Sequence, residues 1–451
     1  MYTPRIAASA VADPKVRGPI PVHVALGDPS RDYPQLAASI DLAARGYLEE
    51  EFFFEGEACN FWMPWFRTGS VFSGGHRFRS RMLVRRPRQA SAFSGVVMVE
   101  WANVTSGCNI DVLWHVMQDY LMRAGHAYAV VSAQRVGIHA EAGGLRAWSP
   151  ARYAELDVTA GGAIVDDSLC YDIFAQAAKA VGAPAGIDPL GGLPRERTVI
   201  AAGASQSAMR LQHHYNSLEP LQQLFDAYLL FLGLGLTFRQ DLTPKLLKVN
   251  TENDVLLLRE GASRQDDSDQ LVTWEIAGAS HVSYGSTVER TPLMRRDGLP
   301  VWEHTCERPA YSRVPAGYVL PAGFEHLLGW LRGGAPPPSM PRIELSKVGT
   351  DKEPSLAVRD ARGNARGGIR LATMDAPIGT NTGVNSGPGF CGLWGSYEPF
   401  DAATLKALYP SHEAYVDAVR RVSEANVRSG VLLPPEAVRT VREAQDSDVG
   451  K

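Results

Sequence analysis

Residues 198–207 read Thr198-Val-Ile-Ala-Ala-Gly-Ala-Ser-Gln-Ser207, a short apolar run followed directly by small residues and a serine. The apolar run predicts a buried strand, and the spacing of apolar residues over 208–215 predicts a helix after it. Ser205 is therefore expected on a tight strand-to-helix turn, where Gly203 and Ser207 must be small to avoid the strand and the helix. A serine in this setting is typical of an activated nucleophile.

The same turn predicts how negative charge would be held beside Ser205. The Gln206 N–H is expected at the helix N-terminus, where the helix dipole favours an oxyanion. A second donor is expected within about one or two residues of the Asn103 N–H, in the loop after the strand predicted at 95–100. Two alternatives remain open: the Gly/Ser-rich turn packs closely or binds a phosphate, and Asn103 caps a turn.

Acidic and histidine partners for Ser205 follow later in the chain. Glu252 and Asp254 come after a strand that ends at Val249, and His281 comes after the strand predicted at 272–276. His281 is expected as the general base, although a lone loop histidine often has no catalytic role. Asp254 is favoured as the acid that orients His281 because the chain turns before it, while Glu252 is the alternative because its side chain reaches further.

Strands and helices alternate through the middle of the chain. Continuous apolar runs are typical of strands that are buried on both faces, so the alternation predicts an α/β fold with a mostly parallel sheet and helices on both faces. The expected strands are residues 95–100, 127–131, 198–202, 227–232, 246–249 and 272–276, and the expected helices are 112–123, 168–181 and 208–215.

The ends of the chain differ from its middle. Residues 47–62 and 76–86 predict antiparallel strands around a turn region at 69–75. We therefore expect an N-terminal β region over 1–90, a core over 91–335 with lid-like insertions near 134–163 and 283–323, and a linker with a C-terminal extension over 336–451. Amphipathic helices are expected from 402 to 445, and residues 405–409 and 415–422 are expected to dock on the core.

The chain resembles the α/β-hydrolase-domain proteins that carry a long N-terminal β region and a C-terminal extension. The resemblance implies an α/β-hydrolase fold and a Ser-acid-His triad in that chain order, and it implies little about the substrate. The sequence departs from the commonest elbow because Ser207 stands in place of glycine. The resemblance lies in residues 46–52 (GYLEEEF), 99–104 (VEWANV), 203–207 (GASQS), 250–254 (NTEND), 277–281 (AGASH) and 363–370 (GNARGGIR).

Composition excludes several classes of protein. Apolar residues make up 45% and charged residues 21% of the 451 residues, which is typical of a folded globular protein. A formal net charge of −4 and a pI near 6.3 give no basic surface for nucleic acid, so no nucleic-acid partner is expected. The most apolar stretch, 227–238, is too short to span a membrane, and the N-terminus does not resemble a signal peptide, so a cytoplasmic location is expected.

Cysteine spacing and cofactor motifs give further expectations. The five cysteines are scattered without C-x-x-C spacing, so all five are expected to be free thiols and no zinc site is expected: Cys59, Cys108, Cys170, Cys306 and Cys391. No dinucleotide or P-loop motif joins a strand to a helix, and we expect neither a cofactor nor a metal.

Together these patterns predict a serine hydrolase that cleaves a small-molecule carboxylic ester through an acyl-enzyme intermediate. An acyltransferase or a lactonase would use the same residues, and a non-catalytic binding protein on the same fold is a further alternative. A homo-oligomer is possible, and the sequence leaves the ester and its chain length open.

Overall fold

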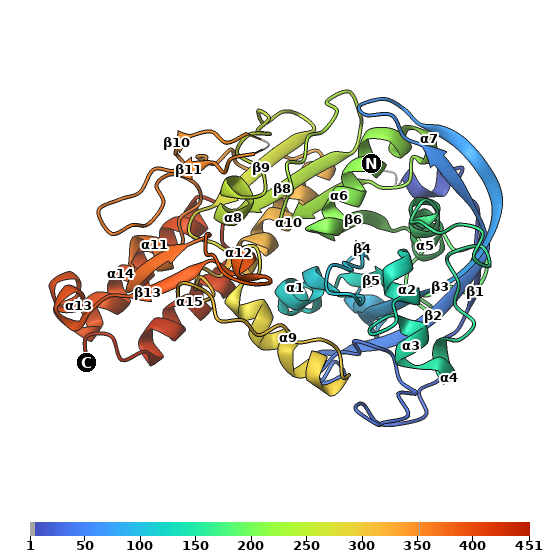
Figure 1. Cartoon of the computed structure of the whole chain (residues 1–451), viewed down its shortest axis with the longest axis horizontal. Coiled ribbons are helices and arrows are strands. Elements are labelled where there is room, and N and C mark those ends of the chain that lie inside the picture. Colours follow the sequence, from blue (N-terminus) through green and yellow to red (C-terminus); the bar gives the residue numbers. More distant parts are fainter. Residues whose placement is uncertain (1–4, 351) are drawn as a thin grey trace. The chain divides into compact units, whose positions relative to one another are not determined.

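The computed structural model describes residues 5–350 and 352–451 (Figure 1). The chain divides into two compact units. The first unit runs up to Leu230 and includes Phe238–Lys245 and Glu289–Val301. The second unit includes Phe231–Thr237, Leu246–Val288 and the chain from Trp302 to the C-terminus. The three-part division expected from the sequence stays a prediction.

The first unit is built on a sheet in which strands run in the order β1-β2-β3-β5-β4-β6-β7. β4 lies between β5 and β6 and is parallel to both, and every residue of β4 and β5 is buried. Continuous burial explains their unbroken apolar sequences. The strands are β1 (Lys15–Arg17), β2 (Tyr47–Trp62), β3 (Ser70–Pro87), β4 (Val96–Trp101), β5 (Ala127–Val131), β6 (Thr198–Ala204) and β7 (Ala227–Phe231).

β2 and β3 form a long antiparallel hairpin, as expected, and β3 continues the sheet by pairing antiparallel with β5. The expected position of the turn is wrong. β3 already begins at Ser70, so the chain reverses over residues 63–69 rather than 69–75. Gly69 N–H donates to the Ser217 carbonyl at 2.8 Å, a contact distant in sequence that local glycine signals do not reveal.

Helices of the first unit include the three expected from apolar spacing, with ends shifted by up to two residues. α5 lies entirely in the interior, and all thirteen of its residues are buried. The helices are α1 (Val112–Arg123), α2 (Arg135–His139), α3 (Leu145–Trp148), α4 (Pro150–Tyr153), α5 (Cys170–Gly182), α6 (Gln206–His213), a π-helical turn (His214–Leu218), α7 (Glu219–Gln222) and 3-10 turns at Arg5–Ala8, Ala43–Arg45 and Ala90–Ala92.

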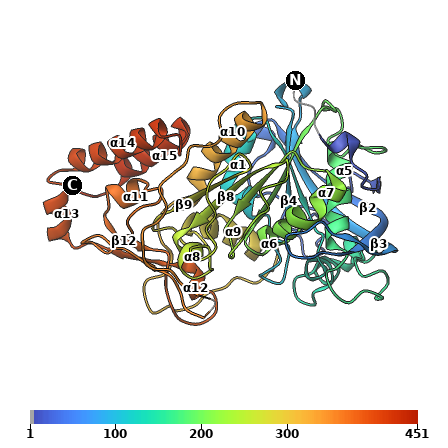
Figure 2. The same cartoon turned by 90° about the horizontal axis from the view of Figure 1, so that it is seen from above.

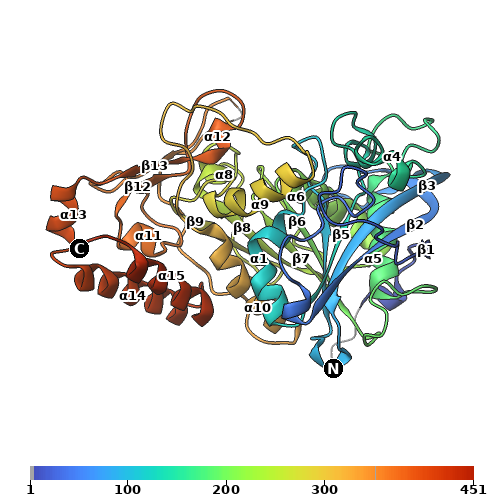
Figure 3. The same cartoon turned by 90° about the horizontal axis from the view of Figure 1, so that it is seen from below.

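The segment over 134–163 packs against the β2–β3 hairpin (Figure 3). Arg79 and Asp157 exchange backbone hydrogen bonds of 2.7 and 2.8 Å. Arg152 Nη2 pairs with Glu51 Oε2 at 2.7 Å, and the Tyr153 hydroxyl donates to Glu51 Oε1 at 2.7 Å. Because this carboxylate is buried, its partners hold the segment firmly to the hairpin.

The second unit contains the parallel strands β8 and β9 and the C-terminal extension. Ile369 of the extension pairs with the edge of β9, since Ile369 N–H donates to the Glu275 carbonyl at 2.7 Å and Ala277 N–H donates to the Ile369 carbonyl at 3.0 Å. The strands are β8 (Lys245–Thr251), β9 (Leu271–Ile276), β10 (Leu345–Lys347), β11 (Leu356–Ala357), β12 (Gly379–Thr382) and β13 (Ser396–Pro399).

The expected C-terminal helices are present, and α14 and α15 lie side by side (Figure 2). Buried apolar residues of these two helices form a cluster with residues from α11 and from the end of α13, so the cluster is drawn from the extension itself: Ala372, Tyr409, Tyr415, Val419 and Ala444 are among its members. The helices are α8 (Glu252–Leu256), α9 (Tyr284–Arg296), which begins in this unit and ends in the first, a 3-10 turn (Ala316–Tyr318), α10 (Val319–Leu331), α11 (Ala372–Asp375), α12 (Cys391–Trp394), α13 (Ala402–Leu408), α14 (His412–Arg428) and α15 (Pro434–Asp446).

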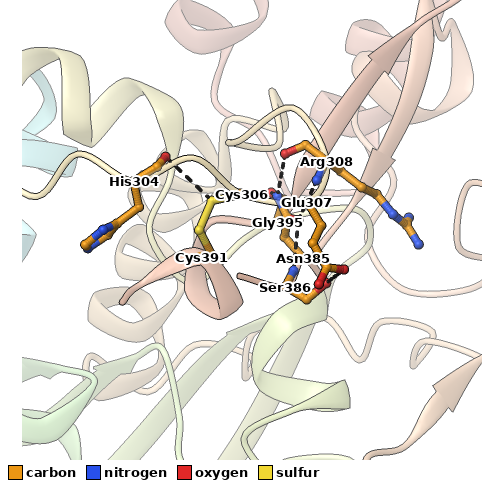
Figure 4. The surroundings of a disulfide bond; sticks show 8 residues. All are labelled: His304, Cys306, Glu307, Arg308, Asn385, Ser386, Cys391 and Gly395. Atoms are coloured by element: carbon orange, nitrogen blue, oxygen red, sulfur yellow. Dashed lines mark hydrogen bonds between the residues drawn. A yellow bond between two sulfur atoms is a disulfide. The ribbon is translucent and has the colours of Figure 1, made fainter. Parts of the chain in front are cut away.

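A disulfide joins Cys306 to Cys391, so the expectation of five free thiols is wrong for these two residues (Figure 4). The two cysteines are 85 positions apart in sequence, and their Cα atoms lie 5.5 Å apart. Asn385 links the same two stretches of chain. Its Nδ2 donates to the carbonyl of Arg308 at 3.1 Å and to the carbonyl of Gly395 at 2.8 Å. The other three cysteines are free thiols, as expected: Cys59, Cys108 and Cys170.

Among the described residues, no helix combines the length and the apolar character that a membrane span requires.

Candidate active site

Ser205 lies at the turn from β6 to α6 with φ +58° and ψ −122°, a conformation that residues other than glycine rarely adopt. The expected strand, serine and helix are therefore present in that order. Gln206 is the first residue of α6, where N–H groups lack partners within the helix and point toward the N-terminal end. The turn thus holds a strained serine beside a helix N-terminus.

The small residues around Ser205 have identifiable roles. A Cβ at Gly203 would lie 3.0 Å from both the carbonyl carbon of Ser207 and Leu211 Cδ1, so a larger residue would force β6 and α6 apart. Ser207, which replaces the commoner glycine, bonds within the turn. Its Oγ donates to the Ala204 carbonyl at 2.9 Å and accepts from the Ala204 N–H at 3.0 Å. Ser207 therefore fits the elbow and also cross-links it.

Asn103 lies beside the elbow, but its backbone N–H is already engaged. This N–H donates to the Ile110 carbonyl at 2.9 Å, so it does not suit the expected role of oxyanion donor. The side chain supports the loops instead, because Nδ2 donates to the Ala204 carbonyl at 2.9 Å and Oδ1 accepts from the Thr105 N–H at 2.9 Å.

The Gln206 side chain is fixed by a neighbouring polar network. Gln206 Nε2 and Trp101 Nε1 both donate to Gln134 Oε1, at 3.0 and 3.1 Å. Gln134 Nε2 donates in turn to Asp167 Oδ2 at 3.0 Å, and Arg210 of α6 pairs with the same oxygen at 2.9 Å. This network fixes Gln134, the first residue of the 134–163 segment, against the start of α6.

In the second unit, His281 and Asp254 form a buried hydrogen-bonded pair. His281 Nδ1 lies 2.6 Å from Asp254 Oδ1, and the two residues are 5% and 0% exposed. A carboxylate at Nδ1 fixes the ring and leaves Nε2 as the nitrogen suited to proton transfer. This geometry favours Asp254 over Glu252 as the acid that orients His281.

Asp254 is held in place by a capping box at the start of α8. Its Oδ2 accepts from the Thr251 N–H at 2.6 Å, and the Thr251 Oγ1 accepts from the Asp254 N–H. The pattern Thr-x-x-Asp over 251–254 is a recognised capping signal, and reading it would have placed Asp254 in the first helical turn. One carboxylate therefore caps the helix with one oxygen and binds His281 with the other.

Glu252 points elsewhere and does not share the His281 contact. Its Oε2 accepts from the Gly278 N–H at 2.7 Å, and its Oε1 pairs with Arg359 Nη2 at 2.7 Å. Arg359 was not among the expected site residues, because nothing local in the sequence links it to a glutamate 107 positions away.

Each predicted site residue thus has a defined place within its own unit. The first unit brings together Ser205, Gln206 and the side chain of Asn103, and the second brings together Asp254, His281 and, through backbone contacts, Glu252. Across the described ranges, no three histidine, cysteine, aspartate or glutamate side chains gather in a way that would hold a metal ion.

Comparisons with known proteins identify the family. The model of the family described as "Alpha/beta hydrolase domain" matches residues 16–442. No curated protein matches the chain.

Similar solved structures include three hydrolases. An α/β serine hydrolase without a lid from Xanthomonas campestris is 14% identical, with 50% of this chain and 92% of that chain covered and a TM-score of 0.30. A cold-adapted esterase from an Arctic intertidal metagenomic library is 12% identical, with 56% and 95% covered and a TM-score of 0.30. Oligopeptidase B from Trypanosoma brucei is 10% identical, with 58% and 39% covered and a TM-score of 0.31.

The family match extends over nearly the whole chain, from residue 16 to residue 442, and covers the strands of the sheet and the strand-to-helix turn described above. The protein is therefore an α/β hydrolase by fold, and it belongs to the alpha/beta hydrolase domain family.

Proposed function

We propose that this α/β hydrolase is a serine hydrolase that cleaves carboxylic esters, with Ser205 as the nucleophile, His281 as the general base and acid, and Asp254 as the residue that orients His281. The observation that carries the proposal is the 2.6 Å hydrogen bond between His281 Nδ1 and Asp254 Oδ1, with both side chains buried. A buried carboxylate on Nδ1 is what a histidine needs to accept a proton at Nε2.

The strained Ser205 supports the same proposal from the first unit. A serine at φ +58° costs free energy, and such strain is commonly kept where the side chain has a chemical role. A phosphate-binding turn would need free N–H donors, and one N–H that borders the turn, that of Ala204, already donates to Ser207 Oγ.

The reaction proceeds in two steps. Ser205 Oγ attacks the ester carbonyl carbon while its proton passes to His281 Nε2, and the C–O bond to the alcohol breaks as His281 returns that proton to the leaving oxygen. Water then attacks the acyl-enzyme and gives a proton to His281, and the carboxylic acid leaves as Ser205 Oγ is protonated again. Asp254 stays ionised throughout and stabilises the imidazolium.

The oxyanion formed in each step requires two N–H donors. The Gln206 N–H at the start of α6 is the first. For the second we favour the Val104 N–H, because successive N–H groups along extended chain point to opposite sides and the Asn103 N–H points to Ile110. Asn103 then acts through its side chain, which fixes the Ala204 carbonyl.

The direct test is labelling with a fluorophosphonate, which reacts with activated serines. Mass spectrometry of the folded protein should find one adduct on Ser205, and heat-denatured protein should carry none. Ser205→Ala should abolish labelling, whereas Ser263→Ala, at another Gly-x-Ser position, should not. Absence of an adduct on Ser205 in folded protein would contradict the proposal.

The ester specificity is tested with p-nitrophenyl esters of increasing acyl length. We expect turnover of small to medium apolar acyl esters without added metal, and we expect EDTA to leave the rate unchanged. A rate lost with EDTA and restored by a divalent ion would contradict a metal-independent mechanism.

A further inference from the structure

The Glu252 carboxylate joins three separate stretches of the second unit. It is completely buried, and Oε2 accepts from the Gly278 N–H at 2.7 Å. Oε1 accepts from the Gly383 N–H at 3.1 Å and from Arg359 Nη2 at 2.7 Å. Gly383 and Arg359 belong to the C-terminal extension, so a single carboxylate ties the extension to the start of α8 and to the loop that contains Gly278.

The start of α8 and the loop over residues 277–281 carry the hydrogen-bonded pair of Asp254 and His281. Glu252 lies two residues before Asp254, and Gly278 lies three residues before His281. The bond from Gly278 N–H to Glu252 therefore runs beside the bond from His281 to Asp254. A shift of Glu252 would move the backbone at both ends of the His281–Asp254 contact.

Asn253 makes a parallel set of contacts between the same stretches. Its N–H donates at 3.2 Å to the carbonyl of Ala279, two residues before His281 in the same loop. Its Nδ2 donates to the carbonyls of Gly383 at 2.5 Å and Gly392 at 2.6 Å in the extension. The extension thus contacts the start of α8 through two neighbouring side chains, Glu252 and Asn253.

Charge makes Arg359 the critical member of this arrangement. A buried carboxylate is costly unless it is paired and fully hydrogen-bonded, and Arg359 supplies the only cation within ion-pair distance of Glu252 among the described residues. The Arg359 side chain is 27% exposed and is oriented by a second hydrogen bond from Nη1 to the Gly363 carbonyl at 3.3 Å. Without Arg359, the buried Glu252 carboxylate would lose its cationic partner and would be destabilised in its present position.

We propose that Arg359 and Glu252 form a positioning clamp, through which the C-terminal extension holds the start of α8 and the histidine loop (residues 277–281) in register for the reaction. Neither residue touches the reacting atoms. The clamp rests on the proposed function, because its effect on rate requires that His281 and Asp254 act in catalysis.

The experiment compares Arg359→Gln with Arg264→Gln. Arg264 pairs with Glu275 at 2.7 Å in the same unit, with side chains 28% and 1% exposed, against 27% and 0% for Arg359 and Glu252. The two pairs are therefore matched in burial and in their shortest distance, although Arg264 makes two hydrogen bonds to Glu275 and Arg359 makes one to Glu252. Only Glu252 bonds to the loop before His281. Arg359→Gln should lower kcat by about tenfold to a hundredfold and change KM less than about twofold, whereas Arg264→Gln should leave kcat within about twofold.

A second measurement follows the His281–Asp254 contact directly. The proton between His281 Nδ1 and Asp254 Oδ1 should give a low-field NMR signal that Asp254→Asn removes. Arg359→Gln should weaken or shift this signal, Arg264→Gln should preserve it, and Arg359→Lys should restore it in part because the cation is retained. If Arg359→Gln does not fold, the comparison of Arg359→Lys with Arg264→Lys decides the proposal in the same way.

The two readouts separate failure of the clamp from failure of the proposed function. Equal kcat and an unchanged NMR signal in Arg359→Gln and Arg264→Gln would overturn the clamp, even if the wild-type protein is an active esterase. A wild-type protein without activity or Ser205 labelling, in which Arg359→Gln still alters the His281 signal, would refute the proposed function and retain the clamp.

Discussion

Glu252 and Asp254 lie two positions apart but have different partners, so their substitution is expected to have different effects on turnover. Asp254→Asn removes the carboxylate 2.6 Å from His281 Nδ1 and should lower kcat by up to about ten-thousandfold, because an amide cannot stabilise the imidazolium. Glu252→Gln should cost about a hundredfold or less, since it acts through backbone positions. Turnover of a p-nitrophenyl ester measures both, with circular dichroism as the check on folding. A larger loss in Glu252→Gln would assign the orienting role to Glu252.

Glu100 in β4 predicts a pH dependence of stability in the first unit. Burial raises the pKa of Glu100 from 4.5 to about 8, although the Tyr128 hydroxyl donates to its carboxylate at 2.5 Å. Because the folded pKa is raised, the stabilisation by protonated Glu100 is complete below pH 4.5 and is lost as the pH rises toward 8.

Glu100→Gln mimics the protonated side chain and should remove this loss. The free energy of unfolding of Glu100→Gln minus that of the wild type should rise by about 1 to 3 kcal/mol between pH 5 and pH 8. Urea unfolding at several pH values measures the difference, in which the titration of other groups cancels. Parallel curves for the two proteins would show that Glu100 does not titrate in this range.

At the scale of elements, the contact between β6 and α6 predicts the effect of enlarging Gly203. Gly203→Ala brings a methyl group within 3.0 Å of the Ser207 backbone, and the crossing of strand and helix must change. We expect a loss of about 1 to 3 kcal/mol in stability and a lower kcat, because Ser205 sits on that crossing. Gly186→Ala is the control, since its added methyl group has no atom within 4 Å. Equal melting temperatures for the two variants would show that the elbow tolerates the methyl group.

The disulfide predicts the thiol chemistry of the chain. Alkylation of denatured, unreduced protein should modify three cysteines, and prior reduction should raise the number to five. Replacing Cys306 and Cys391 by serine should lower stability by about 2 to 4 kcal/mol, whereas Cys59→Ser, at a free thiol, should change it little. Five modified cysteines without reduction would show that the bond does not form. Disulfides persist mainly in oxidising compartments. The cytoplasmic location therefore stays a prediction, and the number of cysteines modified without reduction bears on it.

Local signals predicted the elements, and contacts distant in sequence account for what was missed. The buried strands and α1 follow from unbroken apolar runs and helical spacing, and Ser205 follows from its own turn. Arg359 lies 107 positions from Glu252, and Cys306 lies 85 positions from Cys391. Residue spacing along the chain carries no information over such separations. The Asn103 N–H was expected to donate to an oxyanion, but it donates to the Ile110 carbonyl instead. That bond forms because the loop after β4 folds back on itself, which residue spacing does not reveal.

At the scale of the whole molecule, the C-terminal extension is expected to be part of the hydrolase rather than an attached tail. Ile369, 1% exposed, pairs with the edge of β9, and an uncovered strand edge beside apolar residues promotes aggregation. Trp274 Nε1 of β9 also donates to the carbonyl of Pro338, in the linker that leads into the extension, at 2.8 Å. These contacts lie in the same unit as Asp254 and His281.

Ending the chain at Pro341 should therefore cost both solubility and activity. The truncation removes Ile369 from β9, Arg359 from Glu252 and Cys391 from Cys306, so we expect aggregated protein in size-exclusion chromatography and turnover reduced at least as much as in Arg359→Gln. A chain that ends at Asp446 keeps all three contacts and should behave like the full-length protein. The two truncations differ only in residues 342–446. Unchanged stability and turnover in the chain that ends at Pro341 would therefore mean that the extension folds apart from the site.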